Sequence, residues 1–137
     1  RSLMPQAGLL SRREPTEAEK KDMEYGFAIA KEIGALDIGQ TVVVKNAAVM
    51  AVEAIEGTDE CIRRGAILGR GGVTVAKVAK PNQDLRFDVP SVGPDTLKAM
   101  IEGKASALVI EAGKTLLVDK EKTLALADEH GIAIIAR

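Results

Sequence analysis

Charged side chains alternate with apolar ones in the segment 80–93, which has the sequence Lys-Pro-Asn-Gln-Asp-Leu-Arg-Phe-Asp-Val-Pro-Ser-Val-Gly. If its middle part is extended, the two-residue period of a strand places Asp84, Arg86 and Asp88 on one face. A carboxylate beside a cation can bind a metal ion or orient a water molecule, and cations can hold a diphosphate. The segment therefore predicts a phosphate-handling site.

The same segment has a second interpretation. An Asp-Arg-Asp ion-pair ladder on a solvent-exposed edge strand would show the same alternation. Lys80 and Gln83 add a cation and an amide, and Pro81 and Pro90 restrict strand pairing at the two ends. On spacing alone both interpretations carry equal weight, so the site is a hypothesis at this point.

A further group of acidic residues, Glu53, Glu56 and Asp59, lies where a strand is expected to give way to a helix. Helix capping explains Asp59 without any function and is the favoured interpretation from the residues alone. Glu111 lies between two apolar segments, where a buried and isolated carboxylate would be costly. We therefore expect that a cation pairs with Glu111 or that its side chain faces a cleft.

Glycines and arginines are concentrated in residues 63–72. This composition predicts that a short helix through Cys61 and Ile62 gives way to a flexible basic loop. Backbone amides and guanidinium groups of such a loop could surround a phosphate. The segment lacks the Gly-x-x-x-x-Gly-Lys-Ser/Thr spacing of a P-loop, so it is a weak candidate.

The composition restricts the class of protein. With 137 residues, of which 46% are apolar, the chain can bury one sizeable core. Its net charge of -1 creates no field that attracts nucleic acid, and one tyrosine and two phenylalanines are too few for base stacking. We therefore expect no nucleic-acid partner. The single cysteine, Cys61, excludes a disulfide framework, fits a reducing cytoplasm and is expected in the core.

Hydrophobic periodicity predicts alternating helices and strands. Thr16 and Glu19 form a capping box at the start of an amphipathic helix over residues 16–34, and Pro94 suits the first position of another helix. The remaining expected elements are strands over residues 41–45 and 49–55, paired as a hairpin, strands over 73–78, 107–110, 115–118 and 132–135, and a helix from Asp119 to about residue 129. This order indicates an α/β fold with a mixed sheet flanked by helices. We interpret residues 1–15 as a linker and residues 16–137 as a single domain.

Several blocks of the chain together resemble the LpxI family, whose members are bacterial UDP-2,3-diacylglucosamine pyrophosphatases of lipid A biosynthesis. The most specific blocks are Glu-Gly-Thr-Asp at residues 56–59 and Lys-Pro-x-Gln-Asp-x-Arg-x-Asp-x-Pro at residues 80–90. Matching residues also occur in 37–40, 42–46, 51–55 and 110–113, so the resemblance extends over nearly the whole chain, in order.

The resemblance implies a two-domain enzyme that holds its substrate between an N-terminal and a C-terminal domain. This chain would be the C-terminal catalytic domain with its linker, and it would need the N-terminal domain for full activity. The implied reaction is the magnesium-dependent hydrolysis of UDP-2,3-diacylglucosamine to UMP and 2,3-diacylglucosamine 1-phosphate, known as lipid X. The implied location is the cytoplasm, with transient contact at the inner membrane surface, and a homo-oligomer is compatible with it.

The resemblance also implies roles for single residues, by their position within the matching blocks. Asp88 falls on the family's essential aspartate and is the expected catalytic residue, as metal ligand or general base. Asp59 is expected as a further metal ligand. The expected substrate contacts are Lys80, Gln83, Arg86, Thr58 and Glu111.

Two other classes of function fit the same residues. The first is a non-catalytic sugar-nucleotide or anion-binding module of the same fold. The second is an interaction domain whose acidic and basic ladders are surface salt bridges. Geometry separates this second class from a site, because its Asp84, Arg86 and Asp88 side chains would face open solvent. They would also lie far from Thr58, Asp59 and Glu111.

Overall fold

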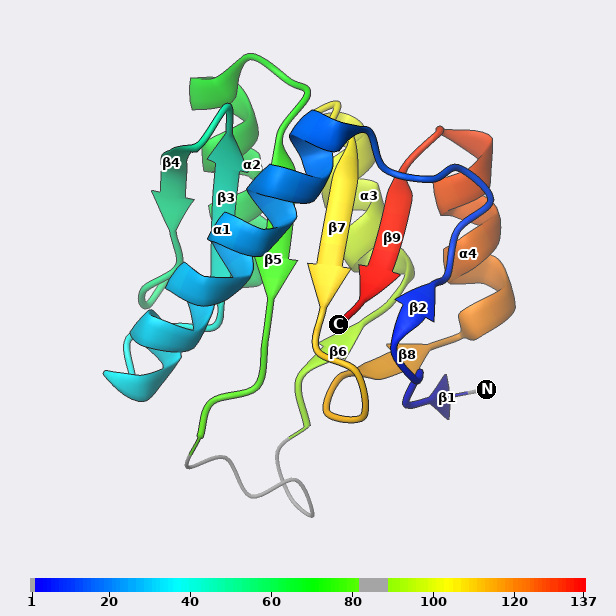
Figure 1. Ribbon diagram of the computed structural model, residues 1–137, viewed down its shortest axis with the longest axis horizontal. Helices are drawn as coiled ribbons and strands as arrows, with labels where there is room; N and C mark the ends of the chain where they lie inside the picture. The colour runs from blue at the N-terminus through cyan, green and yellow to red at the C-terminus, as the bar shows by residue number, and fades with distance from the viewer. Residues whose placement is uncertain (1, 82–88) are drawn as a thin grey trace.

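Helices and strands alternate along the computed structural model, which describes residues 2–81 and 89–137 (Figure 1). The strands are β1 (Ser2–Leu3), β2 (Gly8–Leu9), β3 (Thr41–Lys45), β4 (Ala48–Val52), β5 (Thr74–Lys77), β6 (Ser91–Val92), β7 (Ala107–Ile110), β8 (Leu116–Val118) and β9 (Ala133–Ala136). The helices are α1 (Glu17–Ala35), α2 (Thr58–Gly69), α3 (Pro94–Glu102) and α4 (Lys120–Glu129). In these residues we find no helix with the length and apolar character of a membrane span.

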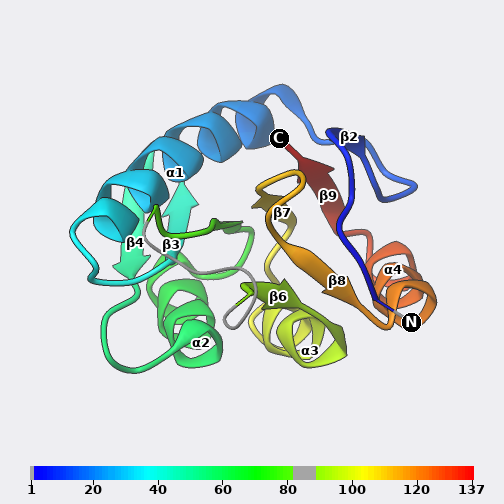
Figure 2. The ribbon, with the colours of Figure 1, turned by 90° about the horizontal axis from the view of Figure 1, so that it is seen from below.

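A six-stranded mixed sheet with the strand order β2-β9-β7-β5-β3-β4 forms the centre of the structure. Helix α1 covers one face of this sheet, and α2, α3 and α4 lie on the other face (Figure 2). A smaller sheet has the order β1-β8-β6. The expected α/β fold, with a mixed sheet flanked by helices, is therefore confirmed.

Three central strands, β5, β7 and β9, are parallel, and they end at the same edge of the sheet. Strand β3 is antiparallel to β5, so β3 begins at this edge, and β4, which is antiparallel to β3, ends there. The arrowheads of β4, β5, β7 and β9 all point toward this edge in Figure 1. We call it the carboxyl edge, and the predicted site residues Lys80 and Glu111 lie in loops that leave it.

Helix α1 begins with the predicted capping box, in which the Thr16 hydroxyl accepts from the Glu19 N–H and the Glu19 carboxylate accepts from the Thr16 N–H. Its stripe of Met23, Ala30 and Ile33 is buried against the α1 side of the sheet. Local sequence therefore determines both the start of this helix and the face that it buries.

The prediction of a flexible basic loop over residues 63–72 is wrong for its first seven residues, because α2 continues to Gly69. Gly65 and Gly69 serve close packing: a Cβ atom at residue 65 would lie 2.5 Å from the Val43 Cβ atom, and one at residue 69 would collide with Val73. The chain leaves the helix only at Arg70, in the left-handed conformation. Gly65 and Gly69 therefore allow α2 to pack close to the sheet and do not indicate a mobile loop.

Residues 2–15 make specific contacts with the rest of the chain. Strand β1 pairs with β8 and strand β2 pairs with β9, both antiparallel. The Arg13 guanidinium donates to both carboxylate oxygens of Glu19 at 2.8 and 2.9 Å, and to the carbonyl oxygens of Ser106 and Gly131. Burial alone would raise the pKa of Glu19, but the hydrogen bonds from Arg13 and Thr16 lower it below its usual value.

The β3–β4 hairpin turns through two residues, Asn46 and Ala47, whose φ angles of 51° and 61° are those of a type I′ turn. Asp22 of α1 is buried and accepts from both turn amides, from Asn46 at 2.9 Å and from Ala47 at 2.8 Å. Hydrogen bonds from the turn amides to Asp22 therefore fix the hairpin turn against α1. The φ angle of Ala47 is positive, a backbone conformation that favours glycine.

We expect Ala47→Gly to raise the free energy of unfolding by about 0.5–1 kcal/mol, because glycine adopts positive φ without a steric clash of Cβ. The matched control is Ala48→Gly, one residue along in β4, which should lower that free energy by about 0.5–1 kcal/mol. Urea denaturation measures both changes. A less stable Ala47→Gly protein would contradict the left-handed backbone conformation of Ala47.

Candidate functional site

Polar side chains gather at the carboxyl edge on the side of the sheet that α2 and α3 cover. Lys77 ends β5 and is paired in register with Thr41, the first residue of β3. Val75 and Val43, two residues farther in, belong to the core beneath these helices, so Lys77 and Thr41 face the same helices. We call the set formed by Thr41, Glu53, Thr58, Asp59, Lys77 and Ser91 the polar edge cluster.

Hydrogen bonds join most members of the polar edge cluster. The hydroxyl oxygens of Thr41 and Thr58 lie 3.1 Å apart, which links β3 to the start of α2. The backbone N–H of Glu53 donates to the Thr41 carbonyl oxygen at 2.9 Å. Lys77 Nζ donates to the Ser91 carbonyl oxygen at 2.8 Å. Four segments that are distant in sequence therefore meet at this edge.

The Lys77 ammonium is the cation of the polar edge cluster. Burial lowers the pKa of Lys77, and the carboxylates of Glu53 and Asp59 oppose part of that shift. In the part of the chain that the structure describes, Lys77 forms no ion pair within 4.0 Å, and its one hydrogen bond is the bond to Ser91. A lysine has three N–H donors, so two of them have no acceptor among the described residues.

Helix α2 points its N-terminus into the cluster. Gly57 occupies the N-cap position with a φ of 91°, and Asp59 and Glu60 lie in the first turn, as the sequence predicts. The expected side-chain cap is absent, since Gly57 has no side chain to provide one. The first amides of a helix have no partner within it and carry partial positive charge, so this end of α2 favours an anion.

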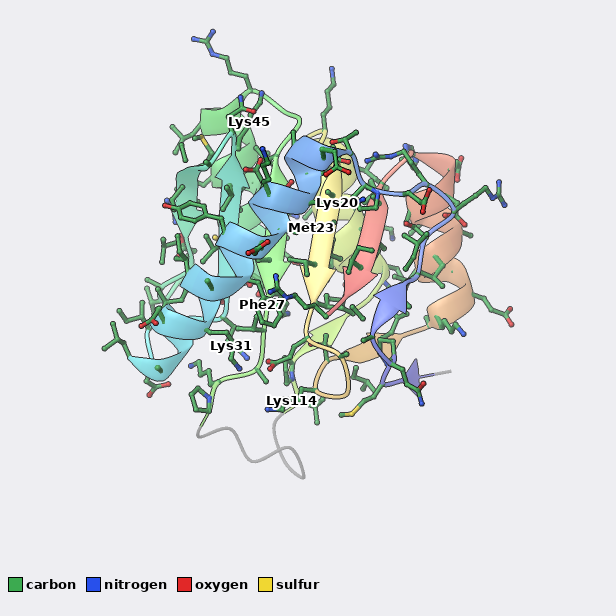
Figure 3. The ribbon with its side chains drawn as sticks, viewed as in Figure 1. Lys20, Met23, Phe27, Lys31, Lys45 and Lys114 are labelled. Carbon is green, nitrogen blue, oxygen red and sulfur yellow. The ribbon has the colours of Figure 1, made fainter. Side chains whose placement is uncertain are left out.

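Glu111 lies at the carboxyl edge as well, but on the α1 side of the sheet. Its side chain is 12% exposed and accepts from Lys31 Nζ at 3.0 and 3.1 Å and from the Ala79 N–H at 3.0 Å. Lys114 Nζ lies 3.8 Å from the same carboxylate. Figure 3 shows Lys31 on the lower part of α1 and Lys114 in the loop after β7. A cation thus pairs with Glu111, which is the first of the two expected outcomes.

Lys80 lies close to the C-terminal end of α1. Its ammonium forms an ion pair with the Asp37 carboxylate at 2.9 Å, and its backbone contacts Gly34. The Lys80 side chain is 29% exposed, so it remains accessible to a ligand at the carboxyl edge.

The structure brings together some of the sequence-predicted site residues. Thr58 and Asp59 lie in the polar edge cluster, whereas Glu111 forms its bonds on the opposite face of the sheet. The expected residues Gln83, Arg86 and Asp88, like Asp84, lie outside the described residues, and their roles stay predictions. Within residues 2–81 and 89–137, no three acidic, histidine or cysteine side chains come together as a metal site.

Lys77 is the charged member of the polar edge cluster that the sequence does not single out. It falls within the segment 73–78, for which the sequence predicts only a strand. The available signal is a single lysine inside the mostly apolar run 73–79, since strands that are buried on both faces rarely contain a charge.

A separate groove of about 270 Å³ lies on the α1 side, with Val109 and Ile135 of the sheet among its lining residues. Met23 of α1 contributes to its wall, and Figure 3 shows this residue beside Lys20 and Phe27 on the helix. The sheet separates this groove from the polar edge cluster, so the two are distinct features of the surface.

Comparison with known proteins matches residues 6–135 to the LpxI C-terminal domain. The chain is 39% identical over 137 residues to the UDP-2,3-diacylglucosamine pyrophosphatase LpxI of Caulobacter vibrioides. This alignment covers 93% of the chain and 49% of that protein. It is 29% identical over 133 residues to the bifunctional purine biosynthesis protein PurH of Brucella anthropi, covering 93% of the chain and 23% of that protein. The chain thus spans about half the length of the first relative and about a quarter of the second.

We expect Glu111→Gln to lower the free energy of unfolding by about 1–3 kcal/mol, because it leaves the Lys31 ammonium without its carboxylate. Glu102→Gln is the matched control: Glu102 pairs with Arg63, but its side chain is 62% exposed. That change should alter the free energy by less than about 0.5 kcal/mol. Urea denaturation measures both, and equal stabilities of the two variants would contradict a structural role for Glu111.

Cys61 is fully buried in the core, as the sequence predicts, and burial raises the pKa of its thiol to about 12. At pH 8 the thiolate fraction of the folded protein should therefore be about 1000-fold lower than that of an exposed thiol. We expect iodoacetamide to label the folded protein very slowly and the urea-unfolded protein at the rate of a free thiol. Equal labelling rates would show that Cys61 is accessible.

Proposed function

Because the chain belongs to the LpxI C-terminal domain family, we propose that it forms the diphosphate-binding part of an enzyme that hydrolyses UDP-2,3-diacylglucosamine. In this reaction the oxygen of water bonds to one phosphorus atom and the bridging P–O bond breaks. The products are UMP and 2,3-diacylglucosamine 1-phosphate. The observation that carries the proposal is the family match over residues 6–135.

The polar edge cluster supports this proposal because its groups suit a diphosphate. The Lys77 ammonium supplies positive charge, and the first-turn amides of α2 supply donors at the same place. The Thr58 hydroxyl, in the first turn of α2, is hydrogen-bonded to the Thr41 hydroxyl at the start of β3. In our proposal these donors bind and orient the phosphates and neutralise part of their negative charge.

Magnesium is the proposed cofactor, and the donor set of the cluster fits it. Glu53 and Asp59 supply carboxylate oxygens, and Mg²⁺ is usually held by one or two carboxylates together with substrate phosphates. A bound magnesium ion would supply positive charge that polarises the phosphoryl oxygens. Asp59 is the residue to which we assign a metal contact, with Glu53 as its neighbour in the cluster.

Asp88 is the proposed essential carboxylate, as metal ligand or as the general base that accepts a proton from the attacking water. Arg86, Gln83 and Lys80 are proposed contacts of the diphosphate or the sugar. Support for these four assignments comes from their positions in the family-like block at residues 80–90.

We propose that the acylated end of the substrate and the surface of the inner membrane lie near the carboxyl edge. Leu36, Ile38 and Ile55 are exposed there, by 70%, 46% and 102%. They belong to two loops that meet where Gly39 packs against the backbone of Glu53. Exposed apolar side chains on adjoining loops are typical of surfaces that contact lipid or protein. A cytoplasmic location and a partner domain at the N-terminal side belong to the same proposal.

The decisive experiment measures UMP release from UDP-2,3-diacylglucosamine by the full-length protein with magnesium. We expect turnover in the wild type and a loss of about 100-fold or more in Asp88→Ala. Asp95→Ala, which changes an exposed aspartate in the first turn of α3, is the matched control and should retain full activity. Chelation of magnesium with EDTA should abolish turnover, and added magnesium should restore it.

Absence of UMP release from the wild type would refute the hydrolase. Unchanged turnover in Asp88→Ala would refute the role of that residue. Tight binding of the substrate by the wild type without turnover would instead favour a non-catalytic sugar-nucleotide binding module.

A further inference from the structure

We propose that the ammonium group of Lys77 binds the diphosphate of the substrate directly, which makes Lys77 a substrate-binding residue of this site. The inference rests on the proposed function, because the diphosphate is the negatively charged part of the substrate that the function requires. Neither the family-like sequence blocks nor the sequence-predicted site residues include Lys77.

The first support is the position of the ammonium group. Lys77 ends β5 at the carboxyl edge, opposite Thr41 of β3 and Ile110 of β7 in register. Its side chain faces the α2–α3 side, where the Thr58 hydroxyl and the first turn of α2 lie. A ligand at this place would therefore meet the ammonium group and the helix amides together.

Second, three partly buried lysines, Lys31, Lys45 and Lys77, differ in how many of their donors the protein uses. Lys31 Nζ has three acceptors within hydrogen-bond distance, namely two oxygens of Glu111 and the Ala79 carbonyl oxygen, so its donors are used within the protein. Lys77 Nζ has a single acceptor among the described residues, the Ser91 carbonyl oxygen. Lys45 Nζ likewise donates to one carbonyl oxygen, that of Gly69, but it lies at the opposite edge of the sheet (Figure 3).

The third support is charge balance. Partial burial of an ammonium without an ion-pair partner is unfavourable, and no carboxylate among the described residues lies within 4.0 Å of Lys77 Nζ. Glu53 and Asp59 are near enough to act on it electrostatically but do not bond to it. Phosphate oxygens that accept from the two remaining N–H donors of Lys77 would give its ammonium group a full set of hydrogen bonds and a negatively charged partner.

The first experiment compares steady-state kinetics of the full-length wild type, Lys77→Met, Lys77→Arg and Lys45→Met. Loss of one charge-assisted contact should lower kcat/KM of Lys77→Met by about 10- to 100-fold, mostly through KM. Lys77→Arg should recover part of that loss, because it keeps the positive charge. Lys45→Met removes an equivalent lysine-to-carbonyl hydrogen bond at the other edge and should leave the kinetics unchanged.

The second experiment uses inorganic pyrophosphate with magnesium as the probe and needs no variant. Limited acetylation of the wild-type protein, mapped by mass spectrometry, reports how accessible each lysine is. Pyrophosphate should slow the acetylation of Lys77 and leave that of Lys45 unchanged. This experiment decides the question even if Lys77→Met does not fold.

The outcomes separate the two proposals. An active wild type whose folded Lys77→Met variant keeps the same KM would overturn the role of Lys77 and leave the hydrolase intact. Lack of protection of Lys77 by pyrophosphate would also overturn that role. If the wild type releases no UMP, the proposed function fails, whereas selective protection of Lys77 would still support a diphosphate-binding ammonium.

Discussion

The parallel pairing of β5, β7 and β9 is the constraint on which the rest of the structure depends. Parallel neighbours require a long return connection, and here α3 lies between β5 and β7 while α4 lies between β7 and β9. Both helices return across the same face, which leaves the other face to α1. The three strands therefore end at one edge, and the loops that follow them are brought side by side. Polar groups from distant segments meet there for this reason.

The sheet also divides the charges at that edge into two environments. On the α1 side, the Lys31 ammonium and the Glu111 carboxylate neutralise one another and tie α1 to the ends of β5 and β7. On the α2–α3 side, Lys77 is partly buried without a bonded carboxylate. A paired buried charge is explained by the fold, whereas a buried charge without a bonded partner in a polar cluster points to a ligand. The distinction lies in the partners and not in the residue type.

Helix α2 illustrates how packing overrides composition. Glycine is common in loops, yet Gly65 and Gly69 lie on the side of α2 that packs against Val43 and Val73. A larger side chain at either position would hold the helix away from the sheet. The close approach in turn positions the first turn of α2, with Thr58 bonded to Thr41, at the carboxyl edge. Packing in the middle of the helix thus determines where its N-terminus presents its amides.

The sequence by itself determined the features that depend on near neighbours along the chain. These are the capping box of α1 and its buried stripe, the hairpin around Asn46 and Ala47, the alternation of helices and strands, and the need of Glu111 for a partner. The blocks of family-like residues also indicated the family. Only the tertiary structure decided which residues face one another. Lys31 and Glu111 are separated by 80 positions, and Lys77 and Ser91 by 14. The strand order and the position of each helix over the sheet determine which residues become partners. Local periodicity indicates the two faces of an element but not which other element each face meets.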